Sequence, residues 1–352
     1  HVLSGAVSSS WGERRTTDNG LELTGSQGKF GYYLSSGYSG SLGLLPNNQG
    51  DFSNAYAKLS YDLPDKGQLS GTVGYFQGNR GDFIFTHLPD FNHKEETYPR
   101  QLFATLQLHK PLNDQFELEL LGRQAIRHNT LQLDALSAEF QSRNLRNDET
   151  DSGFGAKLLW RTDTNILALG LEYDHVWSRT NDTLGNVTML ERRADRWGFY
   201  LNDTLVVGDF SFSPGIRLDL TASSGDQVSP SFGITWQLTP TTLLRGYTAK
   251  GYSLPSFLLE ASSEKVWTSQ IGLESTAIPY LWLKTTLFRN ETWDVTAYDT
   301  TASAYKSERQ LKHGVEFEAK TNPVFATALS LGYSFVDARN TATHEIVKDI
   351  PR

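Results

Sequence analysis

The side chains that most often perform catalysis or bind metals are scattered through this chain of 352 residues. It has no cysteine and eight histidines, which excludes disulfides, thiol chemistry and cysteine-based zinc sites. No histidine falls in a His-Glu-x-x-His pattern, and no Gly-x-Ser-x-Gly, P-loop or dinucleotide fingerprint occurs. We therefore expect no enzymatic activity, no resident metal and no cofactor.

Two short clusters are the remaining candidates for metal chemistry. The acidic run Asn147-Asp-Glu-Thr-Asp151 sits in a predicted external loop, where clustered oxygens suit Ca²⁺, although it does not have EF-hand spacing and also reads as a solvated loop tip. His87 and His93 share another long predicted loop and offer ligands for a metal or haem, although both also suit plain loop positions.

Charge and composition restrict the class of protein. The net charge of −8 argues against a nucleic-acid partner, because phosphate neutralisation needs a basic surface. The sequence contains no run of 18 consecutive apolar residues, so it predicts no transmembrane helix. It also does not open with a signal peptide. The 30 Gly, 15 Tyr, 19 Phe and 8 Trp, with a single Met, favour strands over helices.

Side-chain character alternates with a period of two along nearly the whole chain. In the segment 325–335, for example, large apolar residues alternate with Ala, Ser and Gly, which indicates strands with two different faces. Only 134–146 is doubtful, as a short helix or an irregular loop. The pattern predicts about seventeen strands, at 2–12, 19–27, 29–38, 52–63, 67–78, 99–109, 115–128, 152–162, 165–179, 190–207, 209–221, 227–238, 240–251, 264–277, 280–295, 304–320 and 323–338.

The connections between these strands fall into two sets that alternate along the chain. One set consists of tight turns, such as 63–67 and 110–114, and the other of longer polar stretches, at 39–51, 79–98, 129–151, 180–189, 252–263, 296–303 and 339–352. Short turns at one end and long loops at the other are typical of an antiparallel, up-and-down transmembrane β-barrel. A soluble sandwich or propeller also alternates, but it gives no reason for sorting loops by parity.

The faces of the predicted strands support the barrel. In such barrels the apolar face contacts lipid and the polar face lines a wet lumen. Parity places a set of charged residues in the lumen: Glu117, Glu119, Arg123, Lys157, Glu172, Asp174, Arg196, Arg217 and Arg245. Aromatic residues gather near strand ends, as in interfacial girdles: Trp160, Trp177, Trp197, Trp236, Tyr280, Trp282 and Trp293.

The segment Gly251-Tyr-Ser-Leu-Pro-Ser256 closes one predicted strand before a long loop. It resembles the Gly-Phe-Arg-x-Pro-Ser strand end of the TonB-dependent receptor family of the bacterial outer membrane, with Ser253 where Arg is usual. Glu264, Gln270 and Gly272 match the return strand, where Ser263 replaces a Pro. The segments 30–36, 56–63, 74–82, 312–319 and 332–339 match other family strands, so the resemblance covers the whole chain.

The resemblance implies a receptor that binds a large scarce nutrient, such as a ferric siderophore or a cobalamin-type ligand. Its partners would be outer-membrane lipid, that ligand and the TonB complex. Family barrels have about 22 strands around an N-terminal plug, so residues 1–352 are interpreted as an incomplete barrel domain without the plug, unable to transport by itself. The family's haem-importer pattern is absent, which argues against haem.

The residues proposed to bind ligand, in the lumen or at the external mouth, are Arg123, Lys157, Arg196, Arg217, Arg245, Tyr252 and Trp267. Lumenal cations attract anionic chelates because a cleft lined by one charge sign concentrates such ligands. Alternatively, they pair with the neighbouring lumenal carboxylates or with the plug and only stabilise the barrel, and the two aromatic residues equally suit interfacial anchoring. For the whole chain, the alternatives are a passive porin-like or structural barrel and a soluble β-rich domain.

Overall fold

The computed structural model describes residues 2–82, 93–222, 225–254, 263–299, 304–323 and 326–347. Its strands all belong to one seventeen-stranded sheet. A short 3-10 turn, Glu13–Arg15, lies between the first two strands. The strands are β1 Val2–Trp11, β2 Thr17–Gln27, β3 Phe30–Ser41, β4 Gly50–Asp62, β5 Gln68–Gly81, β6 His93–Pro111, β7 Phe116–Ala135, β8 Arg143–Arg161, β9 Asn165–Asp182, β10 Val187–Val207, β11 Phe210–Thr221, β12 Gln227–Thr239, β13 Thr242–Ser253, β14 Glu264–Ser275, β15 Leu281–Asp299, β16 Ala304–Thr321 and β17 Ser330–Asn340.

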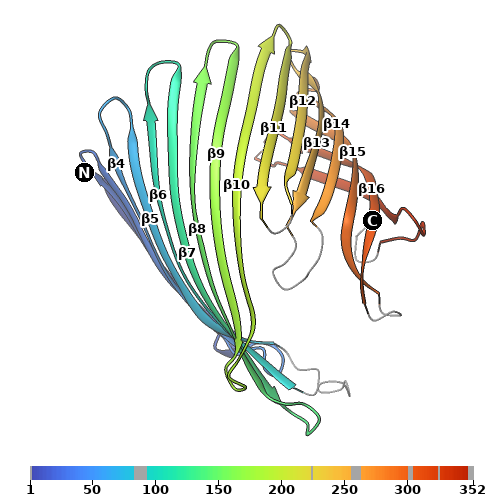
Figure 1. Ribbon diagram of the computed structural model, residues 1–352. Coiled ribbons are helices and arrows are strands. Elements are labelled where there is room, and N and C mark those ends of the chain that lie inside the picture. Colours follow the sequence, from blue (N-terminus) through green and yellow to red (C-terminus); the bar gives the residue numbers. More distant parts are fainter. Residues whose placement is uncertain are drawn as a thin grey trace. The chain divides into compact units, whose positions relative to one another are not determined.

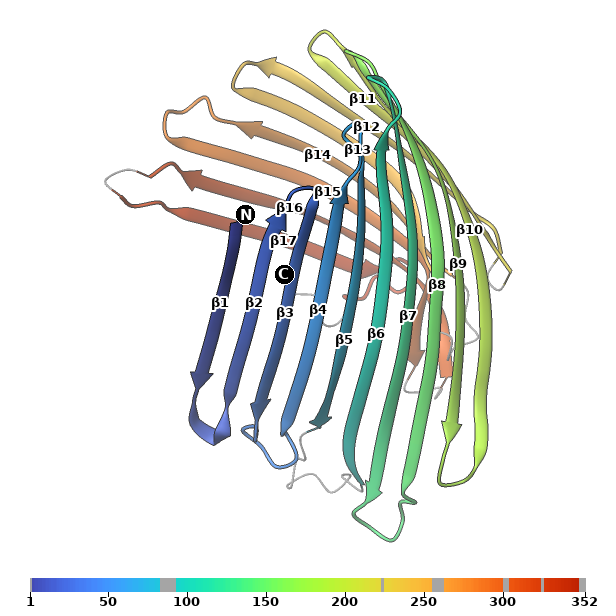
Figure 2. The ribbon, with the colours of Figure 1, turned by 90° about the vertical axis from the view of Figure 1, so that its left-hand side faces the viewer.

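Each strand pairs antiparallel with its neighbour in the chain. The contacts divide the chain into one unit of residues 1–157 with 172–196 and a second of 158–171 with 197–352. In the first unit the ladders run from β1–β2 to β6–β7, and Figure 2 shows these strands side by side in chain order. In the second unit they run from β11–β12 to β16–β17, as Figure 1 shows for β11 to β15. The prediction of an antiparallel up-and-down sheet is confirmed.

The sheet has almost no conventional hydrophobic core. Among the described residues only two apolar side chains, Leu159 and Ala338, are buried. Large apolar residues instead lie exposed at alternate positions, for example Trp197, Phe199 and Leu201 on β10. We call this side of the strands the apolar face and the opposite side the polar face. Exposed apolar surface of this extent needs an apolar environment, because burying it stabilises by about 25 cal/mol per Å².

Several strands are longer than the sequence predicts, and the loops are correspondingly shorter. β6 to β10 each contain 18 to 21 residues. The predicted loop 129–151 shrinks to 136–142, so the doubtful segment 134–146 contains strand ends and a short connection rather than a helix. The predicted loop 180–189 shrinks to 183–186. Polar residues occupy both faces there and hide the alternation, while backbone ladders form regardless of side-chain character.

Two predicted positions of functional interest change for the same reason. The run Asn147–Asp151 lies inside β8 rather than in a loop, which contradicts the calcium-loop alternative in that form. His93 is the first residue of β6, and its ring stacks on Phe140 with centroids 4.4 Å apart. His87 lies outside the described residues, as does the segment 255–262 within the predicted rim loop.

The last strand begins later than predicted. The pattern places it at 323–338, whereas β17 spans Ser330–Asn340 and pairs with β16 from Lys320↔Ser330 to Gln310↔Asn340. Leu329, in the connection before β17, forms two hydrogen bonds with Thr321 at the end of β16. The Leu329 amide donates to the Thr321 hydroxyl, and the Leu329 carbonyl accepts from the Thr321 amide. The described residues 326–329 lie outside the β16–β17 ladder.

Gly314 of β16 lies where β15 and β17 approach closely, and its substitution tests this packing. A methyl group there would meet the backbone oxygen of Phe335 and the ring of Phe288 below normal contact distance, whereas one at Gly332 would meet nothing within 4 Å. Gly314→Ala should lower the free energy of unfolding by about 1–3 kcal/mol, the usual cost of overpacking. Urea unfolding followed by tryptophan fluorescence measures it, with Gly332→Ala as the matched control. Equal midpoints for the two variants would contradict the packing.

Candidate functional site

The polar face of β7 to β10 carries a cluster built around one carboxylate. Asp174 on β9 is 7% exposed and accepts hydrogen bonds from the guanidinium groups of Arg123 on β7 and Arg196 on β10. Alternation brings these residues to one face, as their parity predicts. A backbone glycine, Gly153 of β8, leaves the space that the cluster needs, because a methyl group there would lie 2.8 Å from both Arg123 and Asp174.

The other predicted cations are also paired with carboxylates. Lys157 lies 2.6 Å from Glu119, Arg217 holds Asp219 through two guanidinium nitrogens, and Arg245 lies 3.2 Å from Glu274. Asp219 is fully buried. All five predicted cations therefore form ion pairs, as the stabilising alternative anticipated. Their side chains nevertheless stay 28% to 43% exposed, so the cationic groups are accessible from the polar face.

The two predicted aromatic residues do not join these cations. Arg245 pairs with Gly272, whereas Tyr252 pairs with Lys265 and Trp267 with Lys250 in the β13–β14 ladder. Strand alternation thus places Tyr252 and Trp267 on the opposite, apolar face. Trp267 is 40% exposed there. This placement favours the anchoring alternative.

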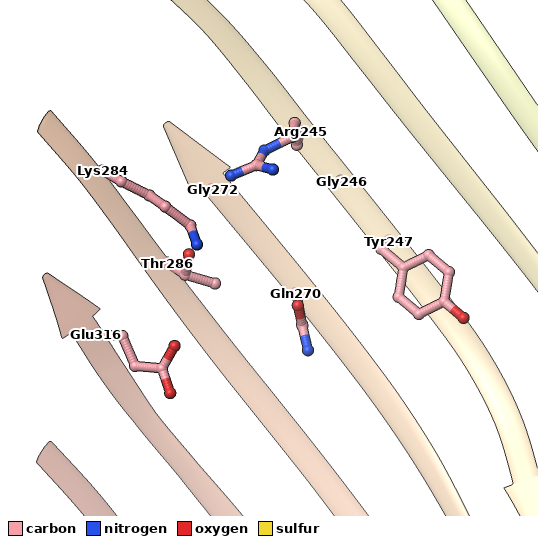
Figure 3. A pocket seen from close by; sticks show the side chains of 8 residues that line it. All are labelled: Arg245, Gly246, Tyr247, Gln270, Gly272, Lys284, Thr286 and Glu316. Atoms are coloured by element: carbon pink, nitrogen blue, oxygen red, sulfur yellow. The ribbon is translucent and has the colours of Figure 1, made fainter. Parts of the chain in front are cut away.

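A cavity of about 210 Å³ lies on the polar face of β13 to β16 (Figure 3). Its central row crosses four strands in register: Arg245, Gly272, Thr286 and Glu316. Gly272 contributes no side chain, which leaves the opening between Arg245 and Thr286. The second row pairs Tyr247 with Gln270. Of these residues, strand parity in the sequence predicts only Arg245. Parity gives the face of a residue but not which residues of β15 and β16 lie beside it across the ladder.

Charges in this cavity are unevenly satisfied. Lys284, which also lines it, lies 3.5 Å from Glu318, and Glu318 lies 3.2 Å from Lys320. The side chains of Glu316 and Gln270 form no ion pair or hydrogen bond within the described part of the chain. The cavity can therefore accept a cationic group at Glu316, while Arg245 and Lys284 attract anions at its other end (Figure 3).

One predicted girdle residue belongs to this polar network. Trp282 donates from its indole nitrogen to Glu274 at 2.9 Å, and Lys320 stands over its ring at 4.9 Å. The alternation of β15 places Trp282 on the same face as Lys284 and Thr286. Its position at a strand end fits a girdle, but its face does not.

A sequence model described as "TonB dependent receptor-like, beta-barrel" matches residues 5–352. The chain belongs to this family. Among the described residues no helix is long and apolar enough to cross a membrane. No curated protein gives a significant sequence match.

Solved structures share the fold of this family member at low sequence identity. The ferripyoverdine receptor of the Pseudomonas aeruginosa outer membrane, solved with ferripyoverdine, has TM-score 0.78 and 14% identity, covering 99% of this chain and 57% of its own. The FrpB iron transporter from Neisseria meningitidis has TM-score 0.73 and 13% identity, covering 98% and 63%. The outer-membrane transporter YddB from Escherichia coli has TM-score 0.72 and 13% identity, covering 92% and 55%. This receptor-like chain thus spans less than two thirds of these proteins.

The Asp174 cluster yields a stability prediction. Asp174→Asn removes the charge that two guanidinium groups share, and we expect a loss of about 2 kcal/mol of unfolding free energy, the usual range for hydrogen bonds to charged groups. Asp195→Asn is the control, because Asp195 lies on the opposite face and is 50% exposed. Urea unfolding measures both variants, and a smaller loss for Asp174→Asn than for Asp195→Asn would contradict the cluster.

A second prediction concerns pH at the loop end of β6, beyond the exposed Leu102 and Leu106. A hydrogen bond from Lys94, and to a smaller extent one from Tyr98, lowers the pKa of Glu96 below its usual 4.5. The hydrogen bond between Tyr98 and Glu96 in turn raises the pKa of Tyr98 to about 12. A lowered folded-state pKa means that Glu96 stabilises the fold above pH 4.5 and loses this effect as the pH falls through the folded-state value.

The wild-type chain should therefore unfold at a higher temperature than Glu96→Gln at pH 7, and the difference should shrink as the pH is lowered below 4.5. Thermal melts across that range measure it. A difference that stays constant with pH would show that Glu96 acts without its charge. The exposed Asp65→Asn substitution, at a turn on another strand pair, controls for general acid destabilisation.

Proposed function

We propose that residues 1–352 form the barrel part of an energy-coupled outer-membrane receptor that imports a large scarce nutrient. The family match over residues 5–352 carries this proposal. Exposed apolar side chains on one face of the sheet and accessible cations on the other support it, because a lipid-facing exterior and a polar lumen require this division.

The proposed ligand is a ferric siderophore or a cobalamin-type compound. Structurally similar proteins include the receptor solved with ferripyoverdine and the FrpB iron transporter. Ion pairing fixes the orientation of Arg123 and Arg196, and their 43% and 33% exposure keeps both guanidinium groups within reach of an anionic chelate. No covalent chemistry is required. Binding is followed by rearrangement of a plug domain, driven by TonB from the periplasmic side.

We further propose that the plug and the remaining strands belong to the same, longer protein. The chain covers 55% to 63% of the similar solved chains named above. The alternative of a passive porin-like barrel draws support from one observation, the carboxylate partner of every predicted lumenal cation. A porin would conduct small solutes without any energy source.

Uptake by the full-length protein, in cells whose own outer-membrane receptors and porins have been deleted, separates these functions. We expect uptake of radiolabelled ferric siderophore or cobalamin that stops when TonB is deleted. Uptake of small sugars that persists without TonB would replace the receptor by the porin. Arg196→Gln should weaken ligand binding by about tenfold, the effect of losing roughly 1.4 kcal/mol. Arg193→Gln, 69% exposed on the opposite face, is the matched control.

A further inference from the structure

Three potential metal ligands converge where β6 and β7 meet their connecting turn. In this ladder His109 pairs with Glu119, and Glu117 pairs with Pro111, so all three side chains project from one face. One donor atom from each lies within 4.8 Å of the others. In the described part of the chain this is the one group of three or more His, Cys, Asp or Glu side chains with such geometry.

The distances suit a small divalent ion. His109 Nδ1 lies 3.4 Å from Glu117 Oε1. Ligands about 2.0–2.1 Å from a tetrahedral Zn²⁺ are separated by about 3.4 Å, so these two atoms already span one edge of the coordination shell. One imidazole and two carboxylates leave a position open for water, and all three residues are half-buried rather than enclosed.

A cation already occupies part of this group. Lys157 of β8 places its ammonium Nζ 2.6 Å from Glu119 Oε2. This ammonium satisfies the charge that a metal ion would otherwise neutralise. Because Lys157 is 32% exposed and has a long flexible stem, it can withdraw from Glu119 without disturbing the strands.

We propose that His109, Glu117 and Glu119 form an exchangeable site for a divalent transition metal of the zinc class, with Lys157 as its internal competitor. Metal binding releases the Lys157 ammonium from Glu119 and requires a neutral imidazole at His109. The inference rests on side chains outside the cavity of β13 to β16 and does not depend on the proposed import function. Lys157 then differs in role from the ligand-binding cations, because its ammonium controls whether a metal ion can bind Glu119.

Titration of the folded, detergent-solubilised chain with Co²⁺, followed by its visible absorption and by displacement with Zn²⁺, tests the site. We expect saturable binding that His109→Ala weakens at least tenfold. Lys157→Met should strengthen binding by about tenfold, because it removes the competitor while keeping all three ligands, an effect in the range found for outer-shell changes. His128→Ala, which removes a histidine paired with Asp148 on the opposite face, should change nothing.

Circular dichroism and heat-modifiable gel mobility verify that each variant is folded. Glu119→Gln replaces His109→Ala if that variant misfolds, and the Lys157→Met result stands independently of any lost ligand. Absence of saturable Co²⁺ absorption, or affinity unchanged in Lys157→Met, would overturn the proposal. Equal weakening by His109→Ala and His128→Ala would show non-specific histidine binding and also overturn it.

Discussion

The antiparallel hydrogen-bond ladder is the constraint on which the other features depend. Each strand satisfies its backbone groups through its chain neighbours, so little apolar packing across layers is needed to hold the strands in place. Side chains are thereby divided strictly between two faces. In water such a sheet would leave too much apolar surface exposed, whereas in a bilayer that surface is in its preferred solvent and the paired backbone meets the absence of water.

On the polar face, the register of the strands decides which charged side chains meet. A shift of one residue would move an entire row of charges to the other face. Asp174 meets two arginines because three different strands keep their registers, and the row from Arg245 to Glu316 crosses four strands. Charges that are paired in this way are held in fixed directions, so these side chains have little conformational freedom left to lose.

Strand length separates two regions of the same sheet. The exposed apolar residues of β6, Leu102 and Leu106, lie in its turn half, whereas those of β10 lie mostly in its turn half but include Val187 and Met189 at its loop end. The loop ends also carry polar groups on both faces. One example is the Trp177 indole, which donates to Glu191 at 3.1 Å on the face that carries Trp197. About ten residues of a tilted strand suffice to cross a bilayer. The 18 to 21 residues of β6 to β10 therefore exceed a membrane span.

Alternation with a period of two is a local property of the chain, so the amino-acid sequence alone predicts the number of strands and the face of the charged residues assigned to the lumen. The ordered motifs, not the alternation, indicate the family. The sequence did not determine where strands end, since polar residues on both faces of 129–151 and 180–189 hide the alternation, although backbone pairing and cross-strand ion pairs such as Arg127–Glu149 and Arg143–Asp182 continue the strands. It also did not reveal which charges meet. The shared carboxylate of Asp174, the position of Glu316 in the cavity and the convergence of His109 with Glu117 and Glu119 depend on register between strands, and register is set only when distant segments pair.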